Sequence, residues 1–110
     1  MKTLFIINDS PYGTERAFNA LRLAMAMQKG GAEMTVFLMA DAVGGARQGQ
    51  TTPNGYYNIE RMLKRVLASS GAVLLCGTCM DARGLRDDEV VTGAKRSTMD
   101  ELAAETVVVF

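Results

Sequence analysis

The most constraining feature of this sequence is a regular alternation between short apolar runs and longer amphipathic segments. The apolar runs are Lys2–Asn8, Met34–Ala40, Ala72–Leu75 and Thr106–Phe110, and a further short strand is expected within Val90–Lys95. Runs that lack polar residues on either face are typical of strands buried on both sides, which is the environment of a parallel sheet. The pattern therefore predicts an α/β fold built on a mainly parallel sheet of about five strands.

The segments between the apolar runs predict the helices. The first is Thr14–Lys29, where apolar residues recur three and four positions apart behind a capping threonine. The second is Tyr57–Ser70, which repeats the pattern, and one or two helical turns are expected at Cys79–Gly84. A last helix, begun by a Ser or Thr cap, is expected over Ser97–Glu105. The order β-α-β-α-β-α-β-α-β predicts a three-layer α/β/α architecture of the flavodoxin-like kind.

The chain has the length of one domain, and residues 1–110 are interpreted as a single α/β domain. Twelve basic and twelve acidic side chains give a formal net charge of zero, which removes the main electrostatic argument for binding nucleic acid. No apolar stretch approaches the roughly 18 residues of a membrane span, and the N-terminus lacks the pattern of a signal peptide. We therefore expect a cytoplasmic protein without nucleic-acid or membrane partners.

Two cysteines and the lack of any histidine restrict the chemistry. Without an imidazole there is no His-assisted activation of a serine or cysteine, and two cysteines disfavour a closed zinc site within one chain. The sequence has neither a GxxxxGK(S/T) motif nor a GxGxxG motif after its first strand, so nucleotide binding has no specific support. We expect no metal and no cofactor. In a reducing compartment, two closely spaced cysteines are more often reactive than structural.

Three predicted loops should meet at one edge of the sheet. Right-handed crossovers place the loops that follow parallel strands on the same side, where ligands bind. These loops are Asn8–Gly13, Asp41–Gly55 with one helical turn at Ala42–Val43, and Cys76–Gly84. The candidate cleft or ligand-binding residues are Asn8, Asp9, Asp41 and Gln48. Turn-making and helix capping are the alternative roles of the Asn and Asp residues.

The strongest candidate site is the sequence Cys76-Gly77-Thr78-Cys79 at the end of the third strand. A thiol beside the first turn of a helix faces unpaired backbone N–H groups, which favour the thiolate and make the sulfur nucleophilic. The spacing of three residues lets both sulfurs approach to disulfide distance within one helical turn. Arg83 lies one turn beyond Cys79 and could add positive charge by folding back. The alternative is that Cys76 is only a small buried residue at a strand end.

Several segments carry a resemblance to a known family: Leu4–Asp9, Gly49–Asn58 with Met62-Leu63 after it, and above all Leu75–Gly84. In these, and in the late segment Ser97–Leu102, the chain resembles the DsrE/DsrF-like sulfur-relay family, including its YchN-like branch, over most of its length. The resemblance implies a small α/β fold that assembles into trimers or hexamers. One departure is that the expected last helix runs into the terminal strand with almost no linker, whereas relatives usually have a longer segment there.

The resemblance also implies a role for the first cysteine. In characterised relatives, a cysteine after the third strand carries a persulfide and passes sulfur between partner proteins. Counting back from Arg83-Gly84 places that position at Cys76. Within the same motif, Cys79 is the second cysteine of a two-cysteine branch, and Thr78, Asp81 and Arg83 take supporting positions.

These observations lead to three hypotheses. In the first, the protein is a sulfur carrier: Cys76 accepts sulfane sulfur from a donor protein as a persulfide and hands it to an acceptor thiol, and Cys79 resolves the persulfide by forming a disulfide and releasing sulfide. In the second, the two cysteines form a dithiol/disulfide redox switch without sulfur transfer. In the third, the chain is a non-catalytic oligomeric module whose cleft holds a small ligand near Asp9, Asp41 and Gln48.

Overall fold

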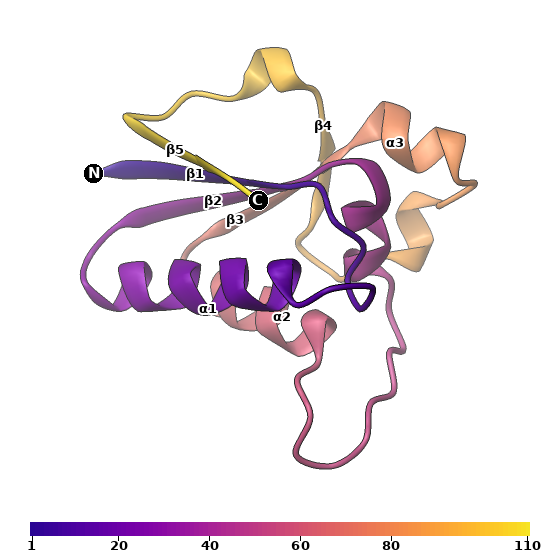
Figure 1. Ribbon diagram of the computed structural model, residues 1–110. Coiled ribbons are helices and arrows are strands. Elements are labelled where there is room, and N and C mark those ends of the chain that lie inside the picture. The colour runs from indigo at the N-terminus through magenta and orange to yellow at the C-terminus, as the bar shows by residue number, and fades with distance from the viewer.

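The computed structural model describes residues 1–110 and is built on a five-stranded sheet in which every strand pair is parallel (Figure 1). The order of strands across the sheet is β4-β3-β2-β1-β5. The strands are β1 (Lys2–Ile7), β2 (Glu33–Leu38), β3 (Ala72–Cys76), β4 (Lys95–Ser97) and β5 (Thr106–Val109). The α/β class and the parallel sheet of about five strands that the sequence predicts are confirmed.

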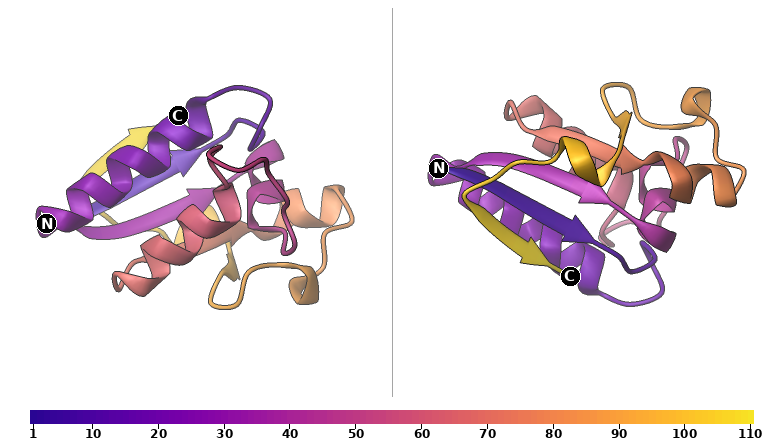
Figure 2. Two further views of the ribbon diagram at one scale, coloured as in Figure 1. Left: turned by 90° about the horizontal axis from the view of Figure 1, so that it is seen from below. Right: turned by 90° about the horizontal axis from the view of Figure 1, so that it is seen from above.

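Two helices cover one face of this sheet. The α-helices are α1 (Arg16–Lys29), α2 (Ile59–Ala68) and α3 (Gly77–Ala82), and three 3₁₀ helices are η1 (Ala40–Ala46), η2 (Asp87–Glu89) and η3 (Met99–Glu101). The helices α1 and α2 lie side by side below the sheet, while η1 and α3 lie at the edge where the strands end (Figures 1 and 2). None of the helices is both long and apolar enough to cross a membrane.

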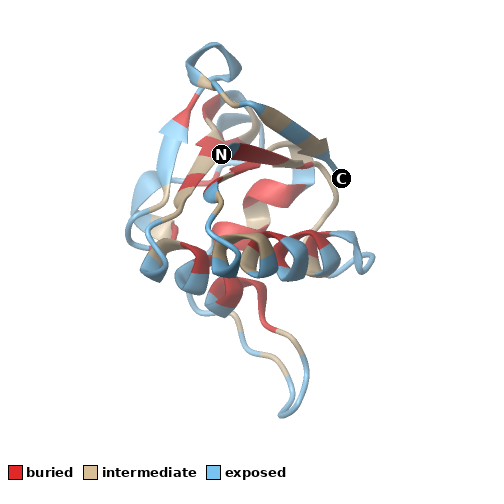
Figure 3. Cartoon of the chain, turned by 90° about the vertical axis from the view of Figure 1, so that its left-hand side faces the viewer, coloured by how far each residue is buried: buried red, intermediate tan, exposed pale blue.

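The main core lies between the sheet and the helices α1 and α2 (Figure 3). Every second residue of β1, β2 and β3 faces this layer, and the apolar ones are Phe5, Ile7, Met34, Val36, Leu38, Val73 and Leu75. Leu4 and Phe37 are also buried but lie outside the main cluster, because they face the opposite side of the sheet. That side is crossed only by residues 98–105, which include η3 (Figure 2). The sheet therefore has one thickly and one thinly covered face.

The two long predicted helices are present but begin later than expected. The helix α1 starts at Arg16 rather than Thr14. Thr14 lies in the loop before it, where its hydroxyl donates to the Asp9 carboxylate (2.9 Å) and accepts from the N–H of Arg16 (3.2 Å). The helix α2 starts after its N-cap Asn58, whose side chain accepts a hydrogen bond from the N–H of Arg61 (3.0 Å). The single helical turn expected after β2 is the longer 3₁₀ helix η1.

The C-terminal part differs more from the sequence prediction. The predicted helix over Ser97–Glu105 is wrong: only the single turn η3 forms, at whose start the N–H of Thr98 donates to the Glu101 carboxylate (3.3 Å). The strand expected within Val90–Lys95 lies later, as β4, and Val90 forms only an isolated antiparallel bridge.

The reach of the chain explains the missing helix. The strands β4 and β5 lie at opposite edges of the sheet, four strand spacings apart, which corresponds to about 19 Å. The stretch from the end of β4 to the start of β5 would advance only about 14 Å as an α-helix. An extended chain of the same length reaches about 30 Å. The segment therefore leaves the helical conformation after one turn and crosses the sheet in an extended form.

Candidate functional site

The two cysteines meet at the point where β3 ends and α3 begins. Cys76 is the last residue of β3 and the N-cap of α3, and its Sγ accepts a hydrogen bond from the N–H of Cys79 (3.3 Å). The thiol of Cys79 donates to the same sulfur, with the two Sγ atoms 2.7 Å apart. Both cysteines are free and half-buried. The predicted approach of the two sulfurs within one helical turn is thus present, and Cys76 accepts both hydrogen bonds.

The Cys79 sulfur is also held from the side of β2. The N–H of Ala40, at the start of η1, donates to Cys79 Sγ (3.2 Å). Ala40 has a φ of 49°, in the left-handed region that residues with a Cβ rarely adopt. Such a conformation persists only where the surrounding structure holds it in place. No feature of the sequence marks this alanine, so the contact between η1 and the dithiol could not be predicted.

The environment of Cys79 keeps this thiol protonated. Burial raises the pKa of Cys79, and the hydrogen bond to Cys76 and the charge of Cys76 raise the pKa further. The Ala40 N–H and the positive charge of Arg83 act in the opposite direction but do not outweigh these effects on the pKa. In the hydrogen bond between the two sulfurs, Cys79 is therefore the donor and Cys76 the acceptor.

Arg83 connects α3 to η1 and does not reach the sulfurs. Its Nε and Nη2 atoms lie 3.0 and 2.9 Å from Oδ1 of Asp41, and its Nη1 donates to the carbonyl oxygen of Cys79 (3.1 Å). Asp41 is thereby the one predicted cleft residue that the structure links to the dithiol. Since the carboxylate offsets the guanidinium charge, the positive charge expected from Arg83 reaches Cys79 only in part.

A second arginine, which the sequence analysis missed, explains the glycine of the motif. Nη1 of Arg96, on β4, donates to the carbonyl oxygen of Gly77 (3.0 Å) and to the carboxylate of Asp81 (3.0 Å). A Cβ atom at Gly77 would lie 3.0 Å from Cγ and Nη1 of Arg96, so a larger residue there would require the arginine side chain to shift. Asp81 thus anchors Arg96 rather than a sulfur atom, and Thr78 is exposed.

The other candidate residues lie apart from the dithiol. The Asn8 side chain donates to the carbonyl oxygen of Phe110 (3.2 Å), and the carboxylate of Asp9 accepts from Thr14. The side-chain amide of Gln48 donates to the carbonyl oxygen of Val90. Asp9, Asp41 and Gln48 line none of the cavities of the structure. No three Cys, Asp or Glu side chains gather closely enough to hold a metal ion.

A parallel five-stranded sheet with two adjacent thiols at its carboxyl edge places the chain in the class of small thiol-bearing α/β proteins. The sequence profile of the DsrE/DsrF-like family matches residues 1–106. The chain belongs to the DsrE/DsrF-like family, which is associated with sulfur relay in general.

Relatives match nearly the whole chain. Protein YchN of Escherichia coli (strain K12) is 40% identical over 108 residues, which cover 96% of this chain and 92% of YchN. An uncharacterized protein of Methanocaldococcus jannaschii is 38% identical over 104 residues, covering 94% of this chain and 90% of its own length.

Solved structures confirm the fold. The crystal structure of the ychN protein from E. coli superposes with a TM-score of 0.92 at 37% identity, covering 100% of this chain and 99% of that one. A protein of unknown function from Methanobacterium thermoautotrophicum superposes with a TM-score of 0.73, covering 87% of this chain and 80% of its own. At 11% identity, this second likeness concerns the fold alone.

Proposed function

We propose that the protein is a sulfur carrier in which Cys76 takes up sulfane sulfur as a persulfide and passes it to the thiol of a partner protein. The observation that carries this proposal is the asymmetry of the dithiol: Cys76 Sγ accepts hydrogen bonds from both the N–H and the thiol of Cys79. The acceptor sulfur is the one on which negative charge develops, and the thiolate is the nucleophile in sulfur chemistry. Membership of a family associated with sulfur relay supports the same assignment.

Uptake and delivery need no net oxidation or reduction. The Cys76 thiolate attacks the outer sulfur of a donor persulfide, a new S–S bond forms on Cys76, and the donor leaves as a thiolate that takes up a proton. Delivery is the same reaction in reverse order, with the acceptor thiolate attacking the outer sulfur and Cys76 leaving as a thiolate. We expect this chemistry in the reducing cytoplasm, where free thiols persist.

Cys79 provides a second reaction for the Cys76 persulfide, in place of delivery to a partner. Its thiolate attacks the inner sulfur of the Cys76 persulfide, forming a disulfide between Cys76 and Cys79 and expelling hydrosulfide. The sulfane sulfur is thereby reduced to sulfide and the two cysteines are oxidised, so a dithiol reductant must restore them. The 2.7 Å separation of the two sulfurs places Cys79 within reach of this attack.

Loading of the protein with a low-molecular-weight persulfide tests the proposal. We expect a mass increase of about 32 Da in the intact chain directly after loading, before Cys79 resolves the persulfide, and the increase should be reversible by a dithiol. The variant Cys76→Ser should load far less, because the remaining thiol, Cys79, has a raised pKa and is mostly protonated, whereas a Thr78→Ser control should load like the wild type. Equal loading of Cys76→Ser and the wild type would refute the assignment of Cys76.

The short distance between the sulfurs of Cys76 and Cys79 supports a second candidate function, that of a dithiol/disulfide redox protein. Two thiols this close can be bridged with little movement of the backbone. This function requires a defined two-electron midpoint potential for the pair and no dependence on sulfane sulfur. A wild type that forms the disulfide with an oxidised dithiol, together with a Cys79→Ser chain that never carries the adduct, would favour the redox function over sulfur transfer.

We further propose that the protein forms a homo-oligomer, a trimer or hexamer, through the thinly covered face of the sheet. The edge strand β5 exposes 53% of Val107 and 63% of Val109, and Met99 on η3 is 52% exposed. Apolar side chains on an unprotected edge strand are a common site of association. The oligomer would repeat the cysteine pair and offer surfaces for donor and acceptor proteins.

Lysines at this face should abolish self-association. We expect the wild type to sediment as an oligomer and the double variant Val107→Lys/Val109→Lys to sediment as a folded monomer, because two charges cannot be buried without partners. Leu23→Lys is the control, since Leu23 is 44% exposed on α1, on the other side of the molecule. A wild type that sediments as a monomer, or an oligomer that survives in the double variant, would contradict the proposed interface.

A further inference from the structure

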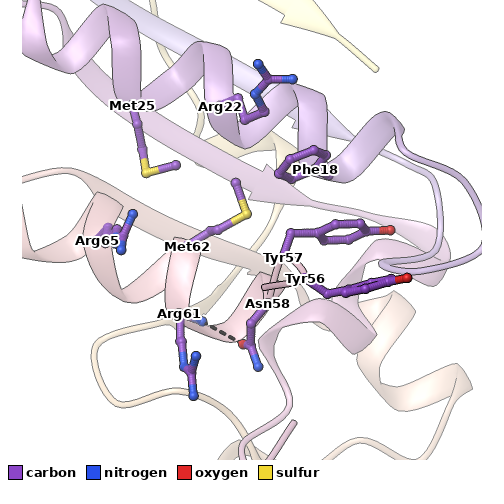
Figure 4. Close-up of a pocket in the computed structure, with 9 residues that line it drawn as sticks. All are labelled: Phe18, Arg22, Met25, Tyr56, Tyr57, Asn58, Arg61, Met62 and Arg65. Carbon is purple, nitrogen blue, oxygen red and sulfur yellow. Dashed lines mark hydrogen bonds between the residues drawn. The ribbon is translucent and has the colours of Figure 1, made fainter. Parts of the chain in front are cut away.

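A cavity that plays no part in the cysteine chemistry lies between α1 and α2 (Figure 4). Its volume is about 300 Å³, at the small end of the range of ligand pockets. The apolar lining consists of Phe18, Met25, Tyr57 and Met62, with Tyr56 beside the opening, and the rim carries Arg22, Arg61 and Arg65. We call this the arginine pocket. None of the residues around the dithiol lines it.

The charge of the pocket is uncompensated. The chain has eight arginines, and five of them form ion pairs with carboxylates. The three that form none are Arg22, Arg61 and Arg65, and all three line this one cavity, which has no acidic residue in its lining. Arg22 contacts only the side-chain oxygen of Asn19 (3.2 Å) and the ring of Phe18 (5.2 Å). Three arginines without carboxylate partners in one cavity favour the binding of an anion.

Two like charges on α2 destabilise this helix at the pocket. Arg61 and Arg65 are four residues apart, so their like charges lie on the same side of the helix and repel each other. Elsewhere on α2 the same spacing is used favourably, between Glu60 and Lys64. An anion held between the two arginines would replace the repulsion with charge-assisted hydrogen bonds.

The apolar part of the pocket suits a flat ring. Tyr57 stacks on Phe18 with ring centroids 4.3 Å apart, and Tyr56 is 71% exposed, leaving a large aromatic surface beside the opening. The thioethers of Met25 and Met62 are adaptable partners for an aromatic ligand. The buried Asn58 holds the loop before α2, donating to the carbonyl oxygen of Gln50 (3.2 Å), so the pocket is formed in advance.

From the uncompensated arginines and the aromatic lining, we infer that the arginine pocket binds a small organic anion that joins one flat ring to a phosphate or carboxylate group. The ring packs against Met25, Met62 and the edge of the Phe18–Tyr57 stack, and the acidic group meets the guanidinium groups of Arg61 and Arg65. Arginine is suited to both contacts, because its planar group binds oxyanions with two hydrogen bonds and stacks on aromatic rings.

Four probes test this inference on the ¹⁵N-labelled chain by NMR. Adenosine monophosphate joins a ring to a phosphate, indole-3-acetate joins a ring to a carboxylate, adenosine has the ring alone, and inorganic phosphate has the anion alone. We expect at least one of the two ring-bearing anions to cause saturable shifts in the amide signals of residues 18–25 and 56–65. We expect adenosine and inorganic phosphate to bind at least tenfold more weakly than the better of these two anions. The better of the two anions identifies the acidic group.

Variants that remove positive charge from the pocket provide a second test of the inference. The double variant Arg61→Gln/Arg65→Gln keeps side chains of similar length and should weaken binding of the better probe at least tenfold. Arg16→Gln is the matched control: Arg16 is 69% exposed, and its contact with Asp9 is long at 3.7 Å. This control should bind the probe like the wild type.

Three results would overturn the inference. The first is the lack of saturable shifts with both ring-bearing anions up to about 1 mM, the weak end of specific recognition. The second is undiminished binding by the double variant. The third is a combination of two observations: the wild type binds no probe, and the double variant has a lower sedimentation coefficient than the wild type. This result would assign the pocket to contacts between copies of the chain.

Discussion

A Cys79→Ser chain that has been loaded with sulfane sulfur should keep the adduct on Cys76 and release sulfide at least about a hundredfold more slowly than the wild type. The attack on the inner sulfur of the persulfide requires a thiolate at position 79, and a serine hydroxyl remains protonated and unreactive there. The measurement is the time course of sulfide release and of the intact mass after the donor has been removed.

Serine is the appropriate replacement because it preserves the surroundings of the site. The N–H of residue 79 still donates to Cys76 Sγ, and a hydroxyl can both donate to this sulfur and accept from the N–H of Ala40. Cys79→Ala serves as the comparison, since it leaves the Ala40 N–H without its partner. Sulfide release by Cys79→Ser at the wild-type rate would show that Cys79 does not resolve the persulfide.

The pH dependence of sulfide release follows from the same geometry. Burial first, and then the hydrogen bond to Cys76 and the charge of Cys76, raise the pKa of Cys79. Release requires the Cys79 thiolate, so the wild-type rate should keep increasing above about pH 8.5, where an ordinary thiol would level off. The residual rate of Cys79→Ser should lack this increase. A wild-type rate that is already constant at neutral pH would contradict the protonated state assigned to Cys79.

The dithiol could be predicted from the sequence because its geometry is local. Cys76 and Cys79 are three residues apart at the junction of an apolar run and a helical segment, and local backbone conformation alone brings their sulfurs together. The groups that tune the site come from distant parts of the chain. Ala40 contributes a backbone N–H and Arg96 reaches Gly77 from an edge strand, and neither contact leaves a pattern in the sequence.

The same distinction holds for the fold. Strands β1, β2 and β3 and helices α1 and α2 follow from apolar periodicity, because each buries its apolar side against the same core. The expected helix over Ser97–Glu105 has genuine capping residues at its start, and the reciprocal bonds between Thr98 and Glu101 do form. What stops it is the distance across the sheet between β4 and β5, which depends on the strand order and not on the local sequence.

The unequal cover of the two sheet faces predicts a large difference between two neighbouring leucines. Leu75 is fully buried in the main cluster, whereas Leu74 is half-buried on the other face and lies outside that cluster. We expect Leu75→Ala to lower the free energy of unfolding by about 2–5 kcal/mol, and Leu74→Ala by about 1 kcal/mol. The first loss is a large share of the roughly 5–15 kcal/mol of a typical domain.

Urea unfolding of the two variants at several protein concentrations measures both effects. The free energy lost by Leu75→Ala should not depend on concentration, because its partners belong to the same chain. If copies associate over the thin face, the free energy lost by Leu74→Ala should grow with protein concentration, because association stabilises the folded chain by mass action. Equal losses at low concentration would contradict the unequal cover of the two faces. A Leu74→Ala loss that is constant at about 1 kcal/mol would instead count against an interface at that face.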